Sequence, residues 1–128
     1  MADPIAVTSG SVVKYNTPVA VAAAAATSSV IDTAEDFEIT YGTGDGRVLI
    51  LATVANTHGS VVLTAPAGAF WAGMAQTVTV PQNAESAFVL EGAKGKLADG
   101  TIVITATPAS GKRLATDHAL KIKAINLF

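Results

Sequence analysis

The stretch TIVITAT at residues 101–107 alternates between two sets of side chains. Ile102, Ile104 and Ala106 fall on one side of an extended backbone, and the residues between them fall on the other. Pro108 ends the stretch because it has no N–H to donate to a strand ladder. This period of two predicts a β-strand with one buried face.

The same period recurs on both sides of this strand along the chain. Thr77–Val80 places its valines inward and its threonines outward before Pro81 ends the run. Near the C-terminus, Leu120, Ile122 and Ala124 face one way, and the two lysines between them face the other. The lysines are expected on the solvent-exposed face, which sets the register of that strand.

A different pattern occurs in Arg47–Ala55, where apolar residues lie on both sides of the pleat. It predicts a central strand covered on both faces. Further strands are predicted at Val12–Tyr15, Val19–Ala23, Phe37–Thr40, Val61–Ala65 and Ser86–Leu90. Tight hairpin turns, for which glycine supplies a positive φ, are predicted at Asp45-Gly46, His58-Gly59, Asp99-Gly100 and Ser110-Gly111. The fold class is therefore all-β, with about eight short strands in a β-sandwich, immunoglobulin-like or jelly-roll-like, or in a small barrel.

The length and the composition indicate one domain with an unusually uncharged surface. A chain of 128 residues fits a single domain. Only 14% of the residues are charged, whereas about 25% is usual. Much of the exterior must then be Ala, Val, Thr, Ser and Gly, which suits a surface covered by a partner. Residues 1–29 are expected to form an extended N-terminal arm or the first strands, and residues 30–128 the sandwich.

Several partners and locations are disfavoured. The net charge of −2, without a basic stripe, disfavours nucleic acid. Without cysteine there is no disulfide framework and no thiolate metal site. The acidic start Met1–Pro4 lacks the pattern of a secretory signal, so synthesis without export is expected. The alanine-rich run Val19–Ala26 is far shorter than the roughly 20 residues that span a membrane, so no membrane partner is expected.

Candidate chemistry is sparse. Asp32, Glu35, Asp36 and Glu38 form one acidic cluster, but they lack the spacing and the glycine of a known calcium loop. A solvated turn before the strand at Phe37 is the favoured interpretation, with no metal or cofactor expected.

The histidines do not suggest a catalytic site. His58 is expected on the surface of a turn. In an extended segment, the neighbouring Asp117 and His118 would point to opposite faces and could not form a hydrogen-bonded dyad. Without an acid–base constellation, no enzyme activity is expected.

The candidate interface residues are aromatic or lie in the alanine-rich run. Phe70 and Trp71 stand among small residues, and in a strand they would face opposite ways. Core packing is the plainer interpretation, and an interface anchor is the functional one. Val19 and Val21 are candidates because the alanine-rich run is expected to pack against something.

Several segments together resemble a family of small virion proteins. They are Asp32–Phe37, Gly44–Ile50, Ala67–Ala72 and Asp99–Ile102, within a resemblance that covers roughly residues 32–128. The resemblance is to capsid decoration or accessory head proteins of tailed bacteriophages, which bind the outside of an assembled shell. It implies a non-enzymatic structural protein on the capsid surface of the virion, with the major capsid protein as partner.

Two further expectations accompany the resemblance. Self-association is expected, because uncharged Ala/Val/Thr surfaces can pack closely without stranding charges. The alternative function is an immunoglobulin-like carbohydrate-binding or adhesion module on a virion or cell surface. That alternative requires a localised polar-aromatic patch, whereas the decoration protein requires a broad apolar footprint.

Overall fold

A computed structural model describes residues 4–11, 18, 20–40, 47–65, 76–91 and 101–127. The described residues form strands and turns, with no helix among them. The strands are β1 (Ile5–Val7), β2 (Gly10–Ser11), β3 (Ala24–Ala25), β4 (Glu35–Thr40), β5 (Arg47–Val54), β6 (Val61–Ala65), β7 (Gln76–Val80), β8 (Ala84–Glu91), β9 (Thr101–Thr107) and β10 (Lys121–Leu127). The all-β prediction is confirmed.

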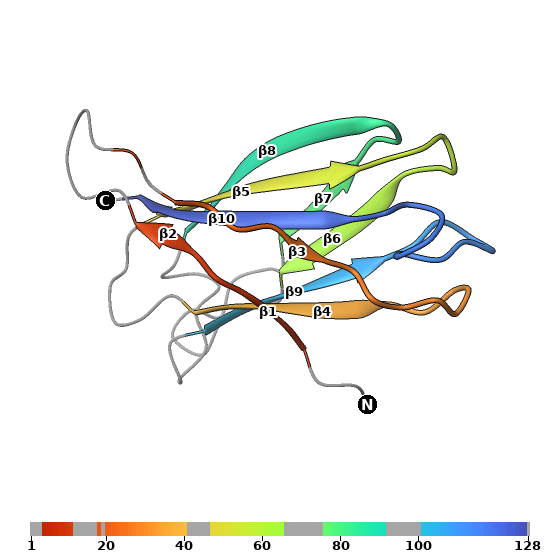
Figure 1. The fold of residues 1–128 in the computed structure, drawn as a ribbon, viewed down its shortest axis with the longest axis horizontal. Helices are drawn as coiled ribbons and strands as arrows, with labels where there is room; N and C mark the ends of the chain where they lie inside the picture. Colours follow the sequence, from red (N-terminus) through yellow and green to blue (C-terminus); the bar gives the residue numbers. More distant parts are fainter. Residues whose placement is uncertain are drawn as a thin grey trace.

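The strands lie in two layers (Figure 1). The first sheet has the order β1-β4-β9-β6-β7. The second sheet has the order β2-β10-β5-β8, and β3 also pairs with β10. The two sheets do not close into a barrel, so the architecture is a β-sandwich.

The core lies between the two sheets and follows the predicted alternation. Ile102, Ile104 and Ala106 of β9 are buried, as are Ile122 and Ala124 of β10. The lysines that alternate with them lie toward solvent, and in β7 the threonines do the same. The inward and outward faces of these three strands are therefore predicted correctly.

The prediction for β5 is correct in part. The strand is central, because β10 and β8 pair with its two edges. Its inner residues are buried, but Leu49 and Leu51 on the outer face are only half-buried. Coverage on both faces is thus wrong. A sandwich gives each sheet one inner face, so the leucines on the outer face stay partly exposed.

Two turn predictions require correction. Gly59 and Gly111 do adopt positive φ values of 102° and 74°. However, Gly59 lies between β5 and β6, and Gly111 lies between β9 and β10. In both cases the two strands belong to different sheets. Both turns are crossings between layers and not hairpins. Local turn residues bend the chain in either case, and only the sheet partners decide which connection results.

The first 29 residues contribute to both sheets. β1 runs parallel to β4, and β2 runs parallel to β10 on the other layer. The strand predicted at Val19–Ala23 is absent from residues 20–23, and Ala24–Ala25 pairs with β10 instead. Alanine has little β-propensity, so only the residues aligned with the β10 edge pair. The strand Val12–Tyr15 and the turns Asp45-Gly46 and Asp99-Gly100 lie outside the described residues.

Candidate interaction surface

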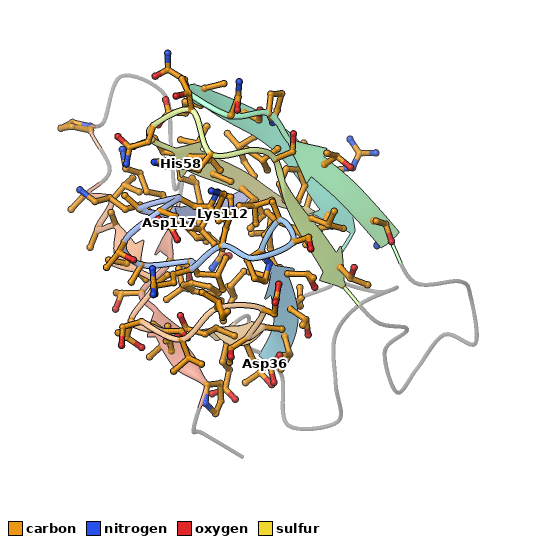
Figure 2. All side chains as sticks on the ribbon, turned by 90° about the vertical axis from the view of Figure 1, so that its right-hand side faces the viewer. Asp36, His58, Lys112 and Asp117 are labelled. Atoms are coloured by element: carbon orange, nitrogen blue, oxygen red, sulfur yellow. The ribbon has the colours of Figure 1, made fainter. Side chains whose placement is uncertain are left out.

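Four connections that cross between the sheets gather at one end of the sandwich. They are residues 26–34, 55–60, 81–83 and 108–120, here called the loop end. Figure 2 looks onto this end and labels His58, Lys112 and Asp117 on it. Each connection contains one non-glycine residue with positive φ, namely Asp32, Asn56, Asn83 and Ala119. Such backbone persists only where surrounding contacts hold it, so the loop end has a defined shape.

Hydrogen bonds join the 26–34 connection to the 108–120 connection. The backbone N–H of Gly111 donates to Oδ1 of Asp32 at 2.6 Å, and the N–H of Asp32 donates to the carbonyl of Lys112 at 3.1 Å. The Arg113 guanidinium donates to the carbonyl of Ser29 at 2.9 Å. Ala115 N–H also donates to the Ser28 carbonyl at 3.1 Å. These bonds, which span more than 70 residues of sequence, hold the two segments together.

Two apolar side chains stand on the held segment. Val30 is 61% exposed and Ile31 is 46% exposed. We call this pair the apolar knob. Side chains of this kind ordinarily bury their surface, and the hydrogen bonds around them remove the freedom to fold inward. A rigid exposed apolar pair loses little conformational entropy when a partner covers it, which favours a role in binding.

The acidic cluster does not converge on one point. Asp32 accepts from Gly111 as described, in the turn before β4. Glu35 accepts from the backbone N–H groups of Thr27 at 3.0 Å and of Ser28 at 2.6 Å. Asp36 accepts from the Thr105 hydroxyl at 2.7 Å. Each of these carboxylates therefore holds a different part of the structure, and no group of three metal-ligating side chains occurs among the described residues.

The geometry predicted for Asp117 and His118 assumed an extended segment, and that assumption is wrong. The segment is a turn, because the N–H groups of both residues donate to the carbonyl of Arg113. The Asp117 carboxylate accepts from Arg113 N–H at 2.7 Å, which lowers its pKa below 3.8; partial desolvation opposes the shift and the Arg113 charge adds to it. His58 is exposed, as expected.

His118 is completely buried and belongs to the 108–120 connection of the loop end. Its Nε2 accepts from the N–H of Ala109 at 3.2 Å, and its own carbonyl accepts from Ala55 N–H at 2.8 Å. The neutral ring must then carry its proton on Nδ1, which lies near the Gly59 backbone without a well-formed hydrogen bond. The ring thus fills space between connections that come from distant parts of the chain.

Burial lowers the pKa of His118 from its usual 6.5. The Asp117 carboxylate opposes this shift in part, whereas His58 and Lys112 add to it. A lowered pKa means that the folded protein favours the neutral ring. His118 is therefore a structural residue of the loop end.

Gly59 is expected to tolerate no side chain. A Cβ built on Gly59 would lie 3.0 Å from Cβ of Ala109, and its φ of 102° disfavours any L-residue. Gly59→Ala should lower the free energy of unfolding by about 2 kcal/mol, measured by denaturant titration. Gly111→Ala is the matched control, since it has a positive φ but nothing within 4 Å of the added Cβ. Equal losses in the two variants would show that the contact with Ala109 contributes nothing.

The sequence-based interface candidates are only partly placed. Val21 is half-buried and lies shortly before β3 in the chain. Val19, Phe70 and Trp71 lie outside the described residues. The apolar knob was not predicted. Its signal in the sequence is two adjacent β-branched apolar residues between Ser28-Ser29 and Asp32-Thr33, where a turn ordinarily carries polar side chains.

The described part of the chain holds no helix with the length and apolar character needed to cross a membrane. In comparisons with models of protein families, with curated proteins and with solved structures, the chain matches none of them.

Proposed function

We propose that this chain is a non-enzymatic structural protein that binds the outer surface of an assembled protein shell, as the phage head accessory proteins that it resembles do. The observation that carries the proposal is the apolar knob, in which Val30 and Ile31 are held outward by hydrogen bonds from the 108–120 connection. The low share of charged residues, 14%, supports a surface that is covered in the working state.

The titratable side chains of the loop end support a structural role. Asp32, Glu35 and Asp117 accept backbone hydrogen bonds that hold the connections in place. His118 is buried against the backbone of Ala109. Side chains that hold the connections in this way stabilise the shape of the loop end, and a fixed shape favours binding of a partner.

Binding of this kind stabilises the assembled shell by thermodynamic linkage. A protein that recognises only the assembled shell lowers the free energy of that state by its own binding free energy. The effect is multiplied over the many identical sites of a shell. The major capsid protein is the proposed partner, and its contact surface is expected to offer an apolar depression for the knob.

Replacing the knob should weaken shell binding without altering the fold. The double variant Val30→Ser/Ile31→Ser is expected to bind purified phage shells at least tenfold more weakly in co-sedimentation, because two exposed apolar anchors are lost. Val103→Ser is the control, since Val103 lies on the outer face of β9 and belongs to none of the four connections of the loop end. Wild-type binding should persist at high salt, because apolar contacts are not screened.

Two outcomes would contradict the proposal. One is a wild-type protein that never co-sediments with shells or leaves them when salt is raised. The other is a double variant that binds as tightly as wild type and has the same melting temperature.

A further inference from the structure

Three of the four outer edges of the two sheets consist of strands with five or fewer described residues. In the first sheet, β1 has only three residues, and β7 has five and is followed by Pro81. In the second sheet, the outer edge of β10 is covered by β2 and β3, which have two residues each. Short strands and prolines are common ways in which proteins prevent edge-to-edge association.

The fourth edge, formed by β8, has none of these protections. β8 has eight residues, and it pairs one-to-one with β5 from Ala84 to Glu91, so no bulge interrupts it. Its sequence AESAFVLE contains neither lysine nor proline. Among the described strands only β5 pairs with it, and it forms the border of its sheet (Figure 1). Val89 on its outer face is 47% exposed.

We propose that β8 pairs antiparallel with β8 of a second copy of this chain, forming a two-fold symmetric dimer. A long and regular strand edge is a template for another strand. In a two-fold dimer each copy covers the same edge of the other, so no unpaired β8 edge remains. The inference goes beyond the proposed function and does not depend on it.

Only the two-fold axes at Ala87 and at Phe88 pair seven residues of β8, and the acidic residues decide between these two registers. If the outer faces of the two copies are to lie on the same side of the joined sheet, residues of the same parity must oppose each other. Placing Phe88 opposite its copy would set Glu85 against Glu91 twice, which is destabilising. Placing Ala87 opposite its copy pairs residues 84–90 and sets no glutamate against another.

This register also places the smallest available side chain at the two-fold axis. Ala87 is exposed on the outer face, beside Leu51 of β5 in the same row. Glu85 would oppose Val89 of the second copy, while its carboxylate still accepts from the Thr53 hydroxyl at 2.8 Å within its own chain. Glu85 therefore keeps its intrachain contact in this register.

A single introduced thiol tests this register directly. The chain has no cysteine, so Ala87→Cys creates its only thiol. Opposed residues of antiparallel strands have Cα atoms about 4.5–5.5 Å apart, which a disulfide can span. Mild oxidation of Ala87→Cys at micromolar concentration should give mainly disulfide-linked dimer. Thr79→Cys, which faces outward from the other sheet on β7, is the control and should stay largely monomeric.

Opposite charges at the axis provide a second test in solution. Wild type is expected to sediment as a dimer, and Ala87→Lys and Ala87→Glu should each raise the dissociation constant at least about tenfold, because like charges meet at the axis. An equal mixture of the two variants should recover the dimer. A monomeric wild type, equal cross-linking of both cysteine variants, or a mixture that stays monomeric would overturn the proposal. Shell binding is not a readout in either test, so the two proposals can fail separately.

Discussion

Deletion of residues 1–29 is expected to abolish the cooperative unfolding transition of the domain. The deletion removes β1 and β2, which border different sheets, together with the buried side chains of Val7 and Ala26. It also leaves the Glu35 carboxylate without the donors from Thr27 and Ser28. The combined loss should exceed about 5 kcal/mol, which is the lower end of the stability of a typical domain. Thermal unfolding followed by circular dichroism measures it.

A shorter deletion provides the control for this experiment. Removal of residues 1–4 ends before β1, so it should change the free energy of unfolding by less than about 0.5 kcal/mol. Retention of a cooperative transition by the chain that begins at Val30 would contradict the prediction. In that case the N-terminal segment would act as an arm whose strands contribute little to the core.

Replacement of His118 by alanine is expected to cost about 3 kcal/mol of unfolding free energy. The ring is fully buried, so its removal leaves a cavity between the connections of the loop end. It also leaves the Ala109 N–H without its acceptor. His58→Ala is the control, because His58 is exposed and should change stability by less than about 0.5 kcal/mol. Similar losses in both variants would show that burial of His118 does not matter.

His118 should also make stability depend on pH in a defined window. Its folded pKa is lower than the 6.5 of an ordinary histidine, so the unfolded chain binds the proton more tightly. The contribution of the neutral ring is therefore complete above pH 6.5 and is lost as the pH falls toward the folded pKa. Protonation must occur at Nε2, where it replaces the bond from Ala109 N–H.

One control variant and one difference in pH range separate this effect from other titrations. His118→Gln keeps an oxygen acceptor and does not titrate, so its stability should change less between pH 7.5 and pH 5 than that of wild type. Asp117 contributes at lower pH, because its folded pKa lies below 3.8 and its stabilisation is lost only under stronger acid. A wild type and a His118→Gln variant with parallel pH profiles would contradict the assignment.

Most strands of the central sandwich could be predicted, because alternation is a local property. β9, β10 and β7 each show the period of two, and the predicted inward residues are the buried ones. The prediction failed where pairing is decided by a distant partner. Residues 20–23 look no less suited to a strand than Ala24–Ala25, but only the latter align with the edge of β10.

The candidate surface could not be predicted for the same reason. The apolar knob is held outward by bonds from Gly111 and Arg113, roughly 80 residues farther along the chain. Exposure of Val30 and Ile31 follows from those bonds and from no local pattern. In the acidic cluster, neighbouring residues of the sequence bind different parts of the fold: Glu35 accepts from Ser28 N–H, and Asp36 accepts from the Thr105 hydroxyl.

By itself the sequence determined the fold class and the inward and outward faces of the long strands, because side chains of an extended backbone alternate wherever the strand lies. Only the tertiary structure decided which sheet each strand joins and how His118 joins the 55–60 and 108–120 connections of the loop end. It also decided that, among the described strands, β8 is the long border strand of its sheet. These properties depend on contacts between residues far apart in the chain, which a local pattern cannot encode.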